Sequence, residues 1–488
     1  MAKKRNRTLH QMENFFPNNG TVDLRKGEAA YAASPAGGDA MDTLRTHVSN
    51  SGVETLVTRG SGALKMYSVD VGGGGMTNIT GAVTFTQDFI YSVNFRGSIF
   101  MKEDNSSKDV FAWNGAGNLT QPAFTGPAGD DKALSHITSY KNRIYFSDYK
   151  GTSIWYGGVD AVTGTLTEFP LASIFRLGGK ISFIGSVSLS GIAVQEVFVI
   201  ISNIGEVVIY QGDYPGANTW GLLGRYTIPR PAGERAFFYW GQDLLIITQQ
   251  GLVSLVSVLN TGIDQEVAYF TDTIFSAFKT EVDALLLSSA NTAIGIVYPG
   301  GPYLVINTYP ATTGHLSDGY ATFVMNLITR SWCRFISTNL VYDWALLKGR
   351  LYFSSFYGVG LADEGDEDFR PDGNQTNVYI RCSLVPAYNY LGNRSSVKQF
   401  VEARPILYQS EGLNITMDAD VDYGNVEPTS KTTDTTDTSY KLYRPRIGLK
   451  GIGKCASIRF DKKYPDVFTK KKMSLQAIDV IWNEGDIV

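Results

Sequence analysis

Three aspartates near the C-terminus have a spacing that could hold a metal ion. Asp418, Asp420 and Asp422 stand at alternate positions before Gly424. A calcium loop of the EF-hand type offers oxygens with this alternation, but its glycine would come one place earlier and its twelfth position, here Thr429, would be glutamate. Aspartate alternating with Ala and Val is also typical of a half-exposed strand. We favour the strand, and the three aspartates remain the metal candidates.

The other side chains with chemical potential are scattered along the sequence. Cys333, Cys382 and Cys455 are odd in number and lack C-x-x-C spacing, which favours buried free thiols over a redox or metal role. The four histidines are also far apart. We therefore assign no catalytic residues and no cofactor.

Residues 147–155, SDYKGTSIW, come close to the Asp-box turn of sialidase-type propellers, which stabilises a surface hairpin. We interpret this turn as structural. No pair of carboxylates with a substrate cradle can be assembled from the sequence, which disfavours a glycosidase. The glycines at 72–75 lack the Lys-Ser/Thr of a phosphate loop, and the lysines at 470–472 are interpreted as solvated surface.

Composition indicates an all-β protein. The 488 residues include 51 Gly, 27 Tyr and 26 Phe, which favour strands and tight turns. A net charge of −4 argues against tight non-specific binding of nucleic acid. The basic start is followed by no apolar signal region, and no apolar run is long enough to span a membrane. We expect a soluble protein made in a cytosol, without membrane insertion.

Repeated hairpin units predict a β-propeller. Residues 320–365 read as a series of short strands joined by polar or glycine turns, such as Lys348-Gly349-Arg350. Similar units recur along the chain, including one in which DLLIIT is followed by a second strand at residues 252–259. Seven units are the best count, within a range of six to eight blades. A β-sandwich with regular hairpins is the alternative.

Aromatic residues on or near these strands are predicted to pack between blades. They are Trp113, Trp155, Trp220, Trp332, Tyr352 and Phe353.

The ends of the chain differ from the repeats. The last hairpin unit lacks an outer strand, and we expect residues 24–32 to supply it and close the ring. The predicted organisation is an N-terminal arm over 1–21, a propeller over 22–365 and a smaller C-terminal β-sandwich-like domain over 366–488. An acidic, turn-rich stretch marks the second boundary. The Thr- and Asp-rich loop at 427–439 is expected to be mobile.

Several stretches resemble one family. FVMNLITRSWCRF, followed by DWALLKGRLYFSSFYGVGLADEGDED, is similar to a recurrent stretch in tail hub or nozzle proteins of short-tailed bacteriophages (podoviruses). The opening ENFFPNNGTVDLRKGE resembles the usual start of these proteins, with its R-K-G strand. VEARPILYQSEGLNITMDADVDYG resembles their strands after the propeller. The similarity is one of pattern and covers both ends and the middle.

The resemblance implies a virion tail protein that is assembled in the host bacterial cytoplasm. Its copies would form a homo-oligomeric ring, with six as the expected number, around the DNA channel below the portal and adaptor. The ring would retain packaged DNA, anchor tail fibres or spikes, and let double-stranded DNA pass transiently. We expect an acidic or neutral lumen, because a channel in which DNA slides should not bind phosphate strongly.

Two alternatives belong to other functional classes. One is a glycan-binding or glycan-hydrolysing propeller that acts as a receptor-binding tail element. The other is a cellular propeller that serves as a platform for protein interactions.

Overall fold

The computed structural model describes most of the chain. The described residues are 11–35, 39–189, 195–261, 269–287, 293–308, 320–369, 378–409, 414–424, 429–432, 441–462 and 472–485. Strands dominate these ranges, as predicted for an all-β protein. No helix among them is long and apolar enough to cross a membrane.

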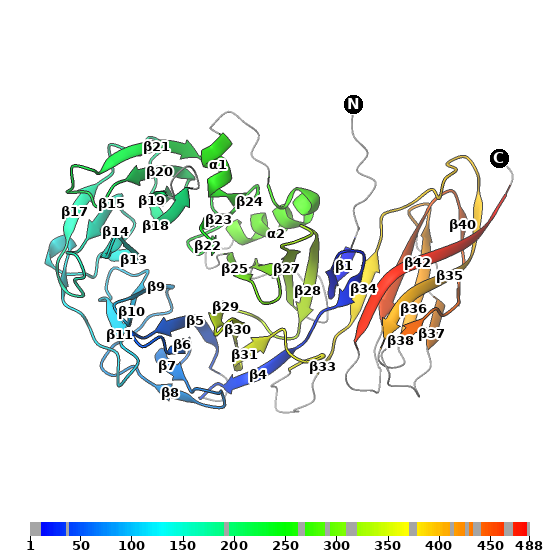
Figure 1. The fold of residues 1–488 in the computed structure, drawn as a ribbon, viewed down its shortest axis with the longest axis horizontal. Coiled ribbons are helices and arrows are strands. Elements are labelled where there is room, and N and C mark those ends of the chain that lie inside the picture. The colour runs from blue at the N-terminus through cyan, green and yellow to red at the C-terminus, as the bar shows by residue number, and fades with distance from the viewer. Residues whose placement is uncertain are drawn as a thin grey trace.

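The protein is a β-propeller whose sheets follow one another around a ring (Figure 1). Six sheets come from consecutive segments between residues 41 and 337, and a seventh closes the ring, so the number lies within the predicted range. The first sheet contains β5 (Met41–Val48), β6 (Glu54–Gly60), β7 (Lys65–Val69) and β8 (Met76–Asn78). The second contains β9 (Ile90–Phe95), β10 (Ser98–Glu103) and β11 (Phe111–Trp113). The third contains β13 (Leu134–Tyr140), β14 (Arg143–Asp148), β15 (Ser153–Tyr156) and β17 (Thr167–Pro170). The fourth contains β18 (Ile181–Leu189), β19 (Gln195–Ser202), β20 (Glu206–Gln211) and β21 (Gly221–Thr227).

The remaining sheets lie nearer the C-terminal domain. The fifth contains β22 (Phe237–Trp240), β23 (Asp243–Thr248) and β24 (Gly251–Ser254). The sixth contains β25 (Ile294–Tyr298), β26 (Tyr303–Asn307), β27 (Tyr320–Asn326) and β28 (Trp332–Ser337). The seventh contains β29 (Asp343–Leu347), β30 (Arg350–Ser355), β31 (Gly358–Ala362) and β4 (Glu28–Ala33). A short pair, β12 (Phe124–Thr125) and β16 (Gly164–Thr165), lies outside the ring sheets.

Two-residue turns with left-handed backbone angles join several inner hairpins. Lys141 and Asn142 have φ of 44° and 57°, and Lys348 and Gly349 have φ of 49° and 73°. Positive φ at both central residues belongs to type I′ turns, whose twist matches that of the flanking strands. The turn predicted at Lys348-Gly349 therefore sets the register of β29 and β30, which pair from Leu347↔Arg350 to Asp343↔Ser354.

Apolar clusters fill the space between neighbouring blades. The cluster between the third and fourth sheets includes Tyr145 and Ile154 from one sheet and Phe198 and Ile200 from the next. Because both faces of a blade are covered, its strands lack a strict apolar–polar alternation. This explains why apolar and polar residues alternate only loosely along the hairpin units of the sequence.

The second strand expected at residues 252–259 is wrong beyond Ser254. β24 ends there and α1 (Leu255–Thr261) begins. The amide of Ser257 donates to Ser254 Oγ at 3.0 Å, and that of Val256 donates to Asp243 Oδ1 at 3.0 Å. Side-chain acceptors of this kind satisfy the first amides of a helix. A second helix, α2 (Phe275–Leu287), packs Phe278, Val282 and Leu285 against the fifth and sixth sheets.

The predicted closing strand is present. β4 pairs antiparallel with β31, from Glu28↔Ala362 to Ala33↔Gly358. Gly358 has φ of 130°, and a Cβ there would lie 2.2 Å from the carbonyl oxygen of Ala32. Only glycine fits this close approach, which brings the N-terminal strand to the last blade.

The C-terminal domain is a sandwich of two sheets. One contains β34 (Cys382–Val385), β41 (Ala456–Lys462), β36 (Asn414–Val421) and β37 (Thr429–Thr432). The other contains β35 (Lys398–Gln409), β42 (Met473–Glu484), β38 (Lys441–Tyr443), β39 (Ile447–Gly448) and β40 (Ile452–Gly453). Phe400 and Leu407 of one sheet pack with Met417 and Phe460 of the other. Of the loop expected at 427–439, residues 427–428 and 433–439 lie outside the described residues.

The predicted boundaries need correction at both ends of the propeller. β1 (Gln11–Glu13) lies between β28 and β34, so a continuous nine-stranded sheet runs from the sixth blade into the sandwich. β2 (Phe15–Pro17) and β3 (Val22–Leu24) extend the sheet of β42. The described part of the arm assigned to 1–21 is therefore integral to two sheets. Likewise, β32 (Glu367–Asp368) and β33 (Val378–Tyr379) extend the seventh sheet past residue 365.

Candidate functional site: charged networks between blades and domains

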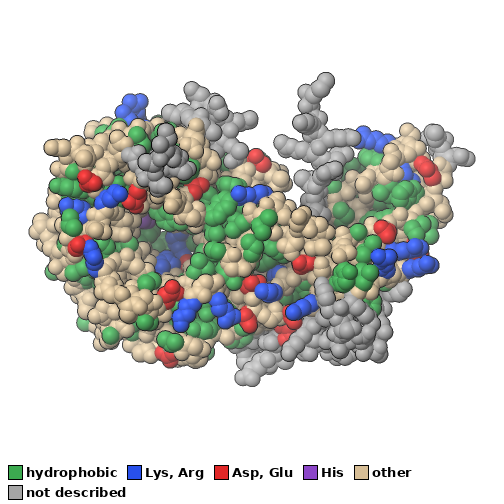
Figure 2. All heavy atoms as spheres, in the orientation of Figure 1, with side chains coloured by type: hydrophobic (Ala, Val, Ile, Leu, Met, Phe, Trp, Pro, Cys, Tyr) green, Lys and Arg blue, Asp and Glu red, His purple; other side chains and the backbone are tan. Residues whose placement is uncertain are grey.

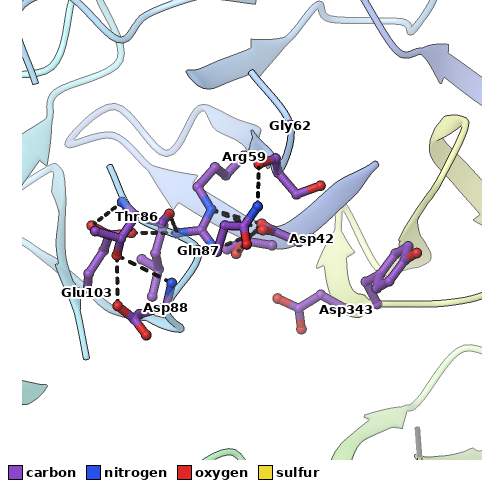
Figure 3. Close-up of polar contacts among 12 residues, drawn as sticks. Asp42, Arg59, Gly62, Thr86, Gln87, Asp88, Glu103 and Asp343 are labelled. Carbon is purple, nitrogen blue, oxygen red and sulfur yellow. Dashed lines mark hydrogen bonds and ion pairs between the residues drawn. The ribbon is translucent and has the colours of Figure 1, made fainter. Parts of the chain in front are cut away.

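A fully buried arginine joins the first two blades. Arg59 on β6 donates from Nε and Nη2 to the carboxylate of Asp42, at 3.0 and 2.8 Å. Its Nη1 donates to Glu103 Oε1 at 2.6 Å and to the carbonyl of Thr86 at 3.0 Å. Figure 3 shows the guanidinium between the two carboxylates. Burial raises the pKa of Glu103 to about 6, although the Thr86 amide and Arg59 oppose this effect.

Asp343 binds a second pair of arginines where the seventh sheet meets the first. Its carboxylate forms ion pairs with Arg235 and Arg45 and accepts the amide of Leu44 at 2.9 Å. Arg45 also donates to the carbonyl of Ile90 at 3.0 Å, on the second blade. Burial lowers the pKa of Arg235, and Asp343 opposes this shift. These contacts bring together segments from four blades near the ring axis.

Aromatic rings continue around the axis from this network. Tyr91, His136, Phe183 and Phe237 come from the successive inner strands β9, β13, β18 and β22, and neighbouring ring centroids are 4.6, 5.1 and 4.8 Å apart. Burial lowers the pKa of His136 to about 3, so this imidazole is neutral at physiological pH. Figure 2 shows a hollow at the centre of the propeller in which histidine and basic side chains are visible.

A third network lies where the propeller meets the sandwich. Arg25, which follows β3, forms a two-point ion pair with Asp368 of β32 and donates to the carbonyl of Ile336 at 2.7 Å. Its Nε donates to Asn14 Oδ1 at 2.7 Å. Both charged side chains are almost completely buried, at 2% and 4% exposure. A charge pair in this environment is stable only when its other hydrogen bonds are also satisfied.

Asn14 connects three separate segments in the same place. Its Oδ1 accepts the amide of Ile336 at 2.7 Å, and its Nδ2 donates to the carbonyl of Arg381 at 2.7 Å. Its backbone has φ of 56°, a left-handed conformation that asparagine tolerates better than most residues. One side chain therefore links β1, the sixth blade and the chain entering β34.

Glu28 is the second acid of this junction. It accepts hydrogen bonds from Ser337 Oγ at 2.7 Å and Asn339 Nδ2 at 2.8 Å. Burial and the charge of Asp368 raise its pKa to about 7, while Arg25 opposes the shift. Near neutral pH this carboxyl is poised between its two protonation states.

The aromatic residues singled out in the sequence lie apart from these networks. Trp113 and Trp332 donate to the carbonyls of Gly117 and Phe270, at 3.1 and 2.8 Å. Trp220 stacks on Tyr210 with ring centroids 5.1 Å apart. Further contacts join Trp155 Nε1 to Asp148 Oδ1 at 2.6 Å, Tyr352 to Tyr31 with ring centroids 4.7 Å apart, and Phe353 to Trp344 with ring centroids 5.8 Å apart. The Asp148–Trp155 contact lies within the Asp-box-like hairpin, in keeping with a structural role.

The metal candidates do not form a cluster in the described part of the chain. Asp418 and Asp420 lie on β36, which confirms the strand. Both side chains are buried, as are Ala419 and Val421, so the strand is not half-exposed as expected. Asp422 follows the strand and accepts the amides of Lys454 and Cys455, at 2.9 and 3.1 Å. No group of three His, Cys, Asp or Glu side chains among the described residues has metal-binding geometry. Cys333, Cys382 and Cys455 are all buried.

The residues of the charged networks were not identified from the sequence. The R-K-G strand that carries part of the family resemblance includes Arg25, and this was the one available signal. Nothing local indicated that its partner would be Asp368, 343 positions away. Glu28, Asn14, Arg59 and Asp343 had no distinctive sequence context.

No protein-family model and no curated protein sequence matches this chain. Solved structures with a similar fold include BamB from Moraxella catarrhalis, with 12% identity and a TM-score of 0.36, covering 72% of this chain and 94% of that one. YCF48 from Cyanidioschyzon merolae has 11% identity and a TM-score of 0.39, covering 68% and 98%. The extracellular domain of the one component system BT4673 from B. thetaiotaomicron has 12% identity and a TM-score of 0.43, and the match covers 77% of this chain but only 43% of that one. At these identities the similarities concern the propeller fold alone.

Proposed function

We propose that this chain is a structural protein of a short-tailed phage tail, of the hub or nozzle type. The observation that carries the proposal is the continuous sheet from β28 through β1 to β34, which joins the propeller to the sandwich. The buried Arg25–Asp368 ion pair reinforces the same junction. A tail component must transmit force between its neighbours, and a shared sheet with a buried ion pair suits that task better than a flexible linker.

In this proposal, copies of the chain form a ring around the DNA channel below the portal and adaptor, with six as the expected number. The ring retains packaged DNA and anchors fibres or spikes. A net charge of −4 is compatible with a lumen that lets phosphates slide past. A pore lined continuously by Lys and Arg would contradict this part of the proposal.

Deletion of the gene from a phage that encodes this chain tests the role. We expect capsids that package DNA but lose it, and tails that are incomplete in particle images. Complementation with the intact gene should restore stable particles. Stable, DNA-filled and infectious particles without the protein would contradict the proposal, as would turnover of host polysaccharide by the purified protein.

A further inference from the structure

The long strand β42 has a neighbour along only part of one edge. It pairs with β35 from Met473↔Gln409 to Glu484↔Lys398. On its other edge, β3 pairs only with Ser474 and Leu475. Among the described residues, positions 476–484 thus have no strand on that side. The backbone amides and carbonyls of such an edge form a template for another strand.

This edge lacks two of the residue types that commonly block pairing. Residues 476–484, QAIDVIWNE, contain neither proline nor lysine, which commonly blunt free edges. Ile481 is 36% exposed, and Val401 on the neighbouring strand is 40% exposed. Val480 and Trp482, which face the sandwich core, are only half-buried. The edge therefore combines open hydrogen-bonding groups with apolar surface.

The propeller has one outer strand of similar character. β21 ends the fourth sheet, and its adjacent Leu222 and Leu223 are 40% and 43% exposed. The other outer strands are less accessible for pairing. β8 and β11 have three residues each, β17 ends at Pro170, β24 runs into α1, and β28 and β4 have further strands beside them.

The two edges are complementary in charge and lie in different parts of the molecule. Residues 476–484 contain Asp479 and Glu484 but no basic residue, whereas β21 contains Arg225 and no acidic residue. Figure 1 places β21 on the rim of the propeller and β42 at the other end of the molecule. A contact between two different surfaces of identical subunits is heterologous and generates rings or helical arrays. Pairing of β42 with itself would instead bring like charges together and stop at a dimer.

We propose that β42 of one copy pairs with β21 of a second copy of this chain. The sandwich of one subunit then extends the fourth propeller sheet of its neighbour by strand addition. This inference rests on the proposed function, because it names the surfaces through which a ring would assemble.

Cysteine cross-linking of the full-length protein tests the contact. The native cysteines Cys333, Cys382 and Cys455 are buried, which leaves introduced surface cysteines as the accessible thiols. A chain carrying both Ile481→Cys and Leu223→Cys should give a ladder of disulfide-linked multimers on mild oxidation. In the matched control, Ile452→Cys replaces Ile481→Cys; Ile452 is 67% exposed but pairs with Gln399 on the opposite side of β35. The control pair should give no ladder.

A charge substitution provides a second measurement that needs no new disulfide. We expect Ile481→Lys to weaken self-association by about tenfold or more in sedimentation equilibrium, because it places a charge on apolar contact surface. Ile452→Lys should leave self-association nearly unchanged. Near-identical circular dichroism and melting of both variants would show that the sandwich is folded.

Several results would overturn the contact. These are an equally strong ladder from the control pair, a dimer as the sole product of Ile481→Cys alone, unchanged association of Ile481→Lys, or a protein that stays monomeric at all concentrations. Rings of the Ile481→Cys, Leu223→Cys protein in which the two cysteines form no disulfide would overturn the edge pairing and leave the tail role standing. Localisation of the protein outside the tail in particle images would overturn the tail role, while a cross-linked ladder would still support the edge pairing.

Discussion

Arg25 and Asp368 form a buried ion pair although 343 positions separate them in the sequence. Arg25 lies three positions before the first residue of β4, the strand that closes the propeller, and Asp368 lies on β32, which extends the last sheet. The pair therefore links the chain that enters the ring to the chain that leaves it. Lys26 and Asp363 form a second, exposed ion pair nearby, with side-chain exposures of 62% and 18%.

Loss of one partner of the buried pair should strongly destabilise the protein. We expect Asp368→Asn to lower the free energy of unfolding by about 3–5 kcal/mol, because it removes the carboxylate that is bonded directly to the buried Arg25 guanidinium. Urea denaturation followed by tryptophan fluorescence measures the loss. Lys26→Met is the matched control and should cost less than about 1 kcal/mol. Equal losses in the two variants would contradict the importance of burial at this junction.

Glu28 should make stability depend on pH. Its pKa is raised from 4.5 to about 7 in the folded protein, so the folded state binds this proton more tightly than the unfolded state. Stability from this group is complete below pH 4.5 and decreases as the pH rises to about 7, by up to about 3 kcal/mol. Burial is the largest cause of the raised pKa; the charge of Asp368 raises it further and Arg25 opposes the shift.

Glu28→Gln tests this dependence, because the amide oxygen retains an acceptor for Ser337 and Asn339. The variant should melt at a higher temperature than the wild type at pH 8 and at a similar temperature near pH 4.5. Glu364→Gln is the control, since Glu364 is 48% exposed in its ion pair with Arg350. A wild-type-like pH profile for Glu28→Gln would show that Glu28 does not titrate as described.

Arg59 should not be replaceable by lysine. The planar guanidinium reaches Asp42, Glu103 and the carbonyl of Thr86 together, and a single ammonium group has no such fork. We expect Arg59→Lys to cost about 2–3 kcal/mol in urea denaturation. Arg96→Lys provides the comparison, because the Arg96–Asp160 pair is about half exposed, and it should have little effect. A fully stable Arg59→Lys protein would argue against this hydrogen-bond geometry.

Substitutions of Asn14 separate its side-chain contacts from its backbone conformation. Asn14→Gly keeps the left-handed φ but removes the bonds to Arg25, Ile336 and Arg381, and we expect a loss of about 2–3 kcal/mol. Asn14→Ala should cost about 1 kcal/mol more, because a Cβ disfavours this backbone angle. Thermal and urea denaturation measure both differences. Equal stability of the two variants would mean that the backbone strain is relieved elsewhere.

Much of the propeller could be predicted because its signals are local. Lys348-Gly349 specifies a tight turn between apolar strands, and the expected closing strand at 24–32 overlaps β4 (Glu28–Ala33). The strand predicted at 252–259 holds only to Ser254, because a short apolar run with β-branched residues suits either a strand or a buried helix. Hydrogen bonds from the first helical amides to the side chains of Asp243 and Ser254 stabilise the helix α1 at this position.

The all-β class, the hairpin units and the strand that closes the ring can be predicted from the sequence, because they follow from apolar patterning and turn chemistry within a few residues. The position of β1 between the sixth blade and the sandwich, and the pairing of Arg25 with Asp368, are visible only in the folded protein. Partners of buried charges are set by ring closure and domain packing, which bring distant segments together. The sequence around such a charge does not indicate which distant residue will pair with it.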